Sequence, residues 1–277
     1  AYEHKPFTAY LKADEGSTTG PELRDYLLLD DNSNETDKVL DDNSGSTSNV
    51  RLERALSVDK WNTLCLPFSM TAEEVESTFG QGTKVEKLTS VETDNNGGCT
   101  LKFGSTSNGI ECGVAYLIKP ANSGSSYTLL ERTISGSNSL KPESNSVSID
   151  GKLSDISFCG TFARKMLGHE KGYDYGEDKT EEYFIQGNTI LHVGDDQLVA
   201  MNGFRAYITA SKAAAKALAK ARIVHGDGSV TGLTLIEAGS TADGPQRVFN
   251  LQGMEQNAGG LQQRGVYIKD GRKYVKK

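Results

Sequence analysis

The sequence predicts an all-β protein: an antiparallel β-sandwich of Greek-key or jelly-roll type, with one or two short helices and a small C-terminal β tail domain. Short apolar segments alternate with turn segments at the spacing typical of sandwiches and barrels. The 30 glycines, together with Asn, Asp and Ser, gather in those turns. Only 36% of the 277 residues are hydrophobic, as expected when antiparallel strands keep one face in solvent.

The chain divides into three parts. Residues 1–48 contain an expected strand at Phe7–Leu11 and two similar acidic segments, LDDNSNET and LDDNSGST. We expect these segments to form turns on either side of a strand at Lys38–Leu40, because Asp, Asn and Ser bond their own backbone in turns. This part belongs either to the sandwich or to a preceding domain. Residues 49–228 form the main sandwich, and residues 229–277 form the tail.

Apolar alternation predicts the strands of the main part. Val50–Leu56 is a half-buried strand, and Trp61–Met70, the densest apolar stretch, is a core strand. Thr71 and Glu74 then form a T-x-x-E capping box for a helix at Ala72–Thr78, which Gly80 ends. Further strands are expected at Lys84–Leu88, Thr100–Phe103, Val114–Ile118, Tyr127–Leu130, Ser146–Ile149, Ser157–Phe162, Tyr183–Gln186, Thr189–Val193 and Phe204–Ile208.

The alanine-rich segment Ser211–Arg222 interrupts the strand pattern and favours a second helix. The alternative is a helix-prone loop between strands, because the segment has no wide apolar stripe. Strands are expected to resume after it, and Asp270-Gly271 is typical of a two-residue hairpin turn. These last strands are Thr234–Ile236, Arg247–Leu251, Gly265–Lys269 and Arg272–Val275.

The four cysteines include no Cys-x-x-Cys pair, which argues against a structural zinc site. Cys99 and Cys112 flank two expected strands around a turn near Ser105–Asn108. A hairpin there would place the two sulfurs opposite each other, so a disulfide is one interpretation and two small buried thiols are the other. Cys65 and Cys159 lie in apolar strand patterns, and we expect them to be inert core thiols.

Several functional classes are disfavoured. The net charge of -7 argues against a nucleic-acid partner. The longest apolar run is far short of the ~18 residues of a membrane span, so the chain is not expected to be membrane-spanning. It contains no nucleophile elbow, clustered histidines or phosphate-binding Gly-x-Gly-x-x-Gly, so we expect no cofactor and no enzyme activity. A glycoside hydrolase stays as an alternative, because it needs only two carboxylates about 5–10 Å apart.

One charged loop could bind a ligand. The segment from Gly168 to Tyr183 carries Tyr173, Asp174, Tyr175 and Tyr183. Aromatic rings flanked by carboxylates suit contact with a sugar or peptide, and loops on a rigid scaffold often carry function. The alternative is an ordinary loop whose tyrosines fold onto the sandwich. The single tryptophan, at position 61, is expected to pack in the core.

The segments WNTLCLPF, AYLIKP and GFRAYI resemble a β-sandwich module of Bacteroidetes-type cell-surface and adhesion proteins. The resemblance spans roughly residues 50–227, although the module's usual sequence lacks the alanine-rich tract. It implies a non-enzymatic, secreted or cell-surface protein with an adhesion or scaffolding role, whose partner is a host or microbial surface glycan or protein. The alternative is a carbohydrate-binding accessory module of a surface system that captures or degrades glycans.

The C-terminal run from Val248 is similar to the sorting tail of type IX secretion. The similarity implies an extracellular location or one on the outer surface of a Gram-negative bacterium. Independently of the resemblance, the basic hairpin could be an exposed edge on which lysines block further strand pairing. The residues that match the tail pattern are Gly253, Gly265, Tyr267, Lys273, Lys276 and Lys277.

Overall fold

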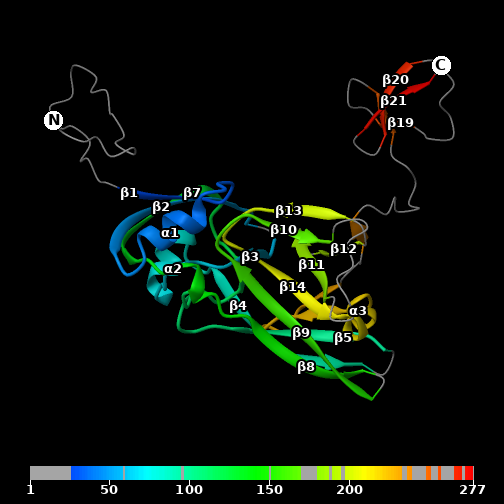
Figure 1. Cartoon of the computed structure of the whole chain (residues 1–277), viewed down its shortest axis with the longest axis horizontal. Helices are drawn as coiled ribbons and strands as arrows, with labels where there is room; N and C mark the ends of the chain where they lie inside the picture. Colours follow the sequence, from blue (N-terminus) through cyan, green and yellow to red (C-terminus); the bar gives the residue numbers. More distant parts are fainter. Residues whose placement is uncertain are drawn as a thin grey trace.

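The computed structural model describes residues 26–58, 60–94, 97–149, 151–169, 180–186, 189–194 and 197–232, and the backbone of five strands between residues 236 and 276 (Figure 1). Strands dominate, in several sheets, with three short α-helices, so the all-β class is confirmed. The sandwich packing of the sheets stays a prediction. No helix in these ranges has the length and apolar character needed to cross a membrane.

The first six-stranded sheet has the order β16-β15-β5-β4-β6-β3. Its pairs are antiparallel except β15–β5, which is parallel. In this sheet β4 and β5 both extend beyond the strands expected from the sequence. Its members are β3 (Asn62–Leu64), β4 (Lys84–Thr93), β5 (Cys99–Ser105), β6 (Tyr116–Lys119), β15 (Arg222–Val224) and β16 (Val230–Gly232).

The second six-stranded sheet has the order β17-β12-β11-β14-β9-β8. One hydrophobic cluster draws side chains from both six-stranded sheets. Within it Phe103 of β5 meets Phe158 edge to face, with ring centroids 5.3 Å apart. The strands are β8 (Glu143–Ile149), β9 (Lys152–Thr161), β11 (Thr180–Gln186), β12 (Thr189–Val193), β14 (Arg205–Ser211) and β17 (Ile236–Ala238).

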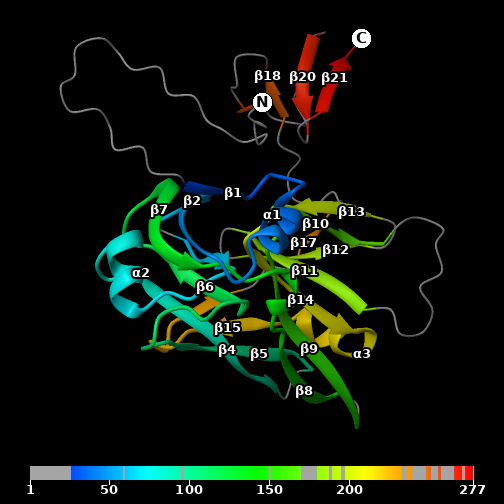
Figure 2. The ribbon, with the colours of Figure 1, turned by 60° about the vertical axis from the view of Figure 1, so that its left-hand side comes forward.

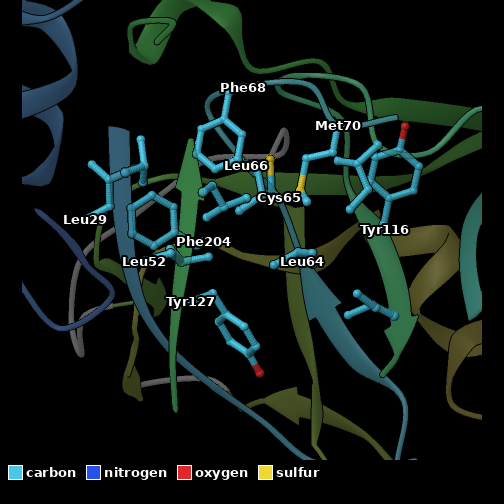
Figure 3. Packing of buried hydrophobic residues seen from close by; sticks show 14 of the residues in the cluster. Leu29, Leu52, Leu64, Cys65, Leu66, Phe68, Met70, Tyr116, Tyr127 and Phe204 are labelled. Atoms are coloured by element: carbon cyan, nitrogen blue, oxygen red, sulfur yellow. The ribbon is translucent and has the colours of Figure 1, made fainter. Parts of the chain in front are cut away.

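A three-stranded sheet covers a second hydrophobic cluster (Figure 3). It consists of β1 (Tyr26–Asp30), β2 (Thr47–Leu56) and β7 (Gly124–Thr133), with β1 parallel to β2. Leu29 and Phe204 both belong to this cluster, and Asp31 Oδ2 lies 2.8 Å from Arg205. Residues 26–48 are therefore packed into the main body. Strand pairing also continues past the expected boundary at residue 229, because β16 belongs to the first six-stranded sheet and β17 belongs to the second.

The first helix corrects a sequence prediction. The strand expected at Lys38–Leu40 is wrong, because α1 (Thr36–Asp42) occupies this position. Helical spacing places Thr36 and Leu40, four residues apart, on one buried face, while the intervening Asp37 and Lys38 are exposed. The two acidic near-repeats therefore differ in structure: the first forms the turn after β1, and the second spans the end of α1.

The other two helices confirm the sequence predictions. Helix α2 (Ala72–Phe79) begins at a complete capping box and ends at Gly80. Helix α3 (Lys212–Leu218) begins at Ser211, whose side-chain oxygen accepts from the Ala214 amide. Its alanines pack into the cluster shared by the two six-stranded sheets. The narrow apolar stripe is sufficient because alanine lets the helix approach the sheet closely.

The sequence predicts a long core strand at Trp61–Met70. The predicted burial of this segment is confirmed, but the prediction that all of it is a strand is wrong. Only β3 is a strand, and the chain then runs irregularly through Pro67, which has no amide hydrogen for a sheet ladder. Backbone bonds to three distant segments replace the ladder: the Cys65 amide donates to Phe204, and the carbonyls of Leu66 and Pro67 accept from residues 113 and 135. The side chains of Leu66 and Phe68 remain buried.

Two small sheets complete the described structure. β10 (Lys165–Gly168) pairs with β13 (Leu198–Met201), and the tail forms a sheet of its own in the order β19-β18-β20-β21 (Figures 1 and 2). The tail strands are β18 (Val248–Asn250), β19 (Glu255–Gln256), β20 (Gly265–Lys269) and β21 (Arg272–Lys276). The expected strand at Phe7–Leu11 and the turn Asp270-Gly271 lie outside the described residues.

Candidate functional site

A polar concavity of about 590 Å³ lies beside the N-terminus of α2, and we call it the α2 cavity. Figure 2 shows α2 on the left of the molecule. Met70 and Tyr116, both labelled in Figure 3, belong to its wall. The lining consists of residues 69–71 and Glu74 around the helix start, Lys87 and Thr89 of β4, residues 104–111, and Tyr116 of β6.

The start of α2 builds one wall of this cavity. Thr71 Oγ1 accepts from the Glu74 amide at 3.2 Å, and Glu74 Oε2 accepts from the Thr71 amide at 2.8 Å. The other carboxylate oxygen of Glu74 accepts from the Arg132 guanidinium of β7. Glu74 is therefore held by both its own helix and a neighbouring strand. The sequence identified Thr71 and Glu74 only as a helix signal, and nothing in the sequence pattern pointed to their place in a cavity.

Two glycines shape the opposite wall. Gly109 has φ +83°, and a Cβ there would lie 2.1 Å from the Met70 carbonyl oxygen. This close approach lets Met70 and Ile110 exchange two backbone hydrogen bonds, of 2.8 and 2.9 Å. A Cβ on Gly104 would lie 2.8 Å from the Thr89 methyl group. The absence of side chains at these two positions brings the loop against the helix start and leaves the floor of the cavity open.

The cavity's carboxylates are both ion-paired. Glu111 Oε1 lies 2.6 Å from Lys141 Nζ, and this contact lowers the pKa of Glu111. The hydrogen bond from Arg132 likewise lowers the pKa of Glu74. Neither group is therefore held protonated as a general acid would be. Lys87 also lines the cavity and makes no ion pair with any residue of the described ranges.

A second polar cluster is buried behind β4. Glu86 Oε2 lies 2.7 Å from His225 Nδ1, and both side chains are 1% exposed. The other oxygen of Glu86 accepts from the Gly226 amide at 2.9 Å. Trp61 stacks on the His225 ring with centroids 4.4 Å apart and planes 6° apart. The cluster joins three distant segments of chain, and its burial indicates a structural role.

The structure corrects one residue of the ligand loop expected from the sequence. Tyr183 is 1% exposed in the core, where its ring lies 4.7 Å from that of His192. Burial raises the pKa of the Tyr183 hydroxyl. It is therefore unavailable as a platform for a ligand. Tyr173, Asp174 and Tyr175 lie outside the described residues. The packing role expected for the single tryptophan is confirmed, because Trp61 packs against the cluster shared by the six-stranded sheets.

The disulfide considered between Cys99 and Cys112 is wrong, because all four cysteines are free thiols. Cys99 pairs with Thr93 at one end of the β4–β5 ladder. Cys112 lies beyond the other end of β5, where its amide donates to Ser69 Oγ at 3.0 Å. The expected hairpin does not form because β5 pairs with β4 and β15. Burial raises the pKa of the Cys99 thiol to about 12 and also raises that of Cys65.

The remaining sequence-predicted residues belong to the tail. Gly265 and Tyr267 lie in β20, and Lys273 and Lys276 lie in β21. These two strands pair in antiparallel register, with Tyr267 opposite Tyr274. The hairpin expected from the sequence is therefore confirmed, and the sorting role stays a prediction. Gly253 and Lys277 lie outside the described residues.

Within the described ranges, no group of three or more His, Cys, Asp or Glu side chains could hold a metal ion. The α2 cavity unites a concave shape with several polar side chains. A second hollow, of about 620 Å³, lies over β1 and β2 and is lined by Tyr26, Leu28, Asp30, Arg51 and Glu53. Comparison of the chain with models of protein families, with curated proteins and with solved structures finds no significant match.

Proposed function

We propose that this chain is a non-enzymatic protein of the outer surface of a Gram-negative bacterium, with an adhesion or scaffolding role, and that it binds its ligand in the α2 cavity. The observation that carries the proposal is the pairing of both cavity carboxylates, Glu74 and Glu111, which lowers both pKa values. A glycoside hydrolase needs one carboxyl group with a raised pKa to act as the acid. The paired carboxylates therefore support binding without hydrolysis.

The location rests on the two sequence resemblances. The tail pattern that includes Gly265, Tyr267 and Lys273 lies on the paired strands β20 and β21, and a folded β hairpin is a suitable signal for a secretion system to read. The test is expression of the full chain, and of a chain without residues 248–277, in a bacterium that has type IX secretion. Antibodies should label intact cells that make the full chain only. Equal labelling of both would refute the sorting role.

A carbohydrate-binding accessory module is the second candidate, and the lining of the cavity favours it. Hydroxyl groups of Ser69, Thr71, Thr89 and Thr106 surround the space, and such groups exchange hydrogen bonds with sugar hydroxyls. The test is a glycan array probed with the wild-type chain and with Asn108→Ala, which removes an exposed amide from the lining. Binding that the variant loses supports this ligand class. Release of new reducing ends from a bound glycan would refute the non-enzymatic role.

A further inference from the structure

Charged side chains of both signs surround the α2 cavity. The cations are Lys87, Arg132 and Lys141, and the carboxylates are those of Glu74 and Glu111 in the lining and of Glu143 near Tyr116. Arg132 pairs with Glu74, and Lys141 pairs with Glu111. Lys87 is the remaining cation: it is exposed, and no described residue forms an ion pair with it. The chain as a whole carries a net charge of -7, and Lys87 is the lysine of the cavity lining that forms no direct ion pair within the described ranges.

Lys87 contributes a positive charge to the lining of the cavity. Lys87 stands opposite Gly104 in the β4–β5 ladder, and Gly104 has no side chain to cover it. Lys87 also contributes to lowering the pKa of Glu111, although Lys141 has the larger effect. An exposed ammonium group that forms no direct ion pair in a concave polar site is a favourable contact for a carboxylate of the ligand.

The hydroxyl groups that line the cavity with Lys87 can still donate and accept further hydrogen bonds. Ser69 and Thr71 use their oxygens to accept from backbone amides, so their hydroxyl hydrogens are available to donate. Thr89 and Thr106 already donate to the carbonyls of residues 102 and 109, so their lone pairs are available to accept. A ligand that both donates and accepts at closely spaced positions satisfies this set, and a sugar ring does so.

From these contacts we infer that the α2 cavity binds a sugar that carries a carboxylate, of the uronic acid or sialic acid class. Lys87 pairs with the carboxylate, and the four hydroxyl groups bind the ring hydroxyls. This inference rests on the proposed function, because it names the ligand class of the same site. An acidic peptide shares the carboxylate but lacks the ring hydroxyls that would use Ser69, Thr71, Thr89 and Thr106.

The test is calorimetric titration of the full chain with four probes at low salt. The probes are a galacturonic acid trisaccharide, sialyllactose, lactose and a peptide of alternating Glu and Gly. We expect one of the two acidic sugars to bind, and which of them binds identifies the source of the carboxylate. Raising the salt concentration should weaken this binding, because the contact with Lys87 is exposed.

Two variants separate the inference from the proposed function. Lys87→Gln should weaken binding of the acidic sugar by about tenfold, the usual loss for one charge-assisted hydrogen bond. The matched control is Lys102→Gln, which removes a lysine of β5 that pairs with Glu92 at 2.7 Å outside the cavity; its binding should equal that of the wild type. Neither lysine is buried, and thermal unfolding checks that both variants fold.

Each outcome of these titrations that contradicts the inference overturns a specific part of it. Lactose binding as tightly as the acidic sugars, with no loss in Lys87→Gln, overturns the acidic ligand and leaves the α2 cavity as a binding site. Preference for the peptide also overturns the sugar class. Binding of an acidic sugar that Lys102→Gln weakens as much as Lys87→Gln overturns the site assignment. Failure of the folded wild-type chain to bind any of the probes overturns both the inference and the proposed binding function of this cavity.

Discussion

The carboxylate of Glu86 and the imidazole of His225 form a buried pair, 2.7 Å apart and separated by 139 residues of chain. Glu86 lies in β4, in the middle of the first six-stranded sheet. His225 directly follows β15, which is separated from β4 by β5 in the same sheet. A buried ion or hydrogen-bonded pair of this kind is costly to break, because the remaining partner stays out of water without compensation.

Replacement of Glu86 should therefore destabilise the fold strongly. We expect Glu86→Ala to lower the free energy of unfolding by about 3–5 kcal/mol, the usual cost of removing one partner of a buried pair. The matched control is Glu92→Ala in the same strand, whose 55% exposed side chain pairs with Lys102 and whose loss should cost less than about 1 kcal/mol. Urea unfolding measures both. Equal effects of the two changes would contradict a structural role for the buried pair.

The fluorescence of the single tryptophan reports on the same cluster. Trp61 stacks on His225 at a centroid distance of 4.4 Å, and a stacked imidazole quenches an excited indole. We expect His225→Leu to raise the Trp61 emission in the folded state. His192→Leu is the control, because the His192 ring contacts Tyr183 instead. Unchanged emission in His225→Leu would show that the stacking does not persist in solution.

Substitutions at two glycines with similar φ angles distinguish the cost of backbone strain from the cost of a steric clash. Gly109 and Gly82 have φ +83° and +85°. A methyl group added at Gly109 would lie 2.1 Å from the Met70 carbonyl oxygen, whereas one added at Gly82 would meet nothing within 4 Å. Gly82→Ala should cost about 1 kcal/mol, the penalty for alanine in the left-handed region. Gly109→Ala should cost at least twice that in the free energy of unfolding, measured in urea. Equal costs would mean that the loop does not pack against Met70.

The thiols should react in an order set by burial. Cys65 and Cys99 are both 0% exposed, and burial raises both of their pKa values, so neither should react with a thiol reagent while the chain is folded. Cys112 is partly exposed and should react first. Mass spectrometry of labelled protein, native and in denaturant, checks the order. Fewer than four labels after denaturation without reductant would restore the disulfide that the structure rejects.

Acid should destabilise the protein in part through Glu74. The Arg132 contact lowers the pKa of Glu74 below its usual value of 4.5. The stabilising contribution of this group is therefore complete above pH 4.5 and is lost as the pH falls through the folded-state pKa. Unfolding of Glu74→Gln should depend less on pH between about 6 and 3 than that of the wild type. Glu73→Gln, an exposed neighbour in the same helical turn, should retain the wild-type dependence.

Local sequence patterns were sufficient for elements whose stability is local. The capping box at Thr71 and Glu74 identified α2, and alternation identified β2, β12 and β20, because these signals depend on residues close together in the chain. The strands β1, β10 and β13 were missed, because their sequences YLLLD, KMLG and LVAM show no alternation of polar and apolar residues. The strand expected at Lys38–Leu40 was wrong because its apolar residues fit a helical face equally well.

The sequence by itself determined the all-β class, helix α2 and the absence of a local zinc motif, and it favoured helix α3 over a loop, since each depends on composition or on neighbours in the chain. Only the tertiary structure decided that Tyr183 is buried, that Cys99 and Cys112 lie at opposite ends of β5, and that Lys87 shares a cavity with Thr71. These facts depend on which strands pair across long stretches of chain. Strand pairing is set by the packing of whole faces, and no short segment carries that information.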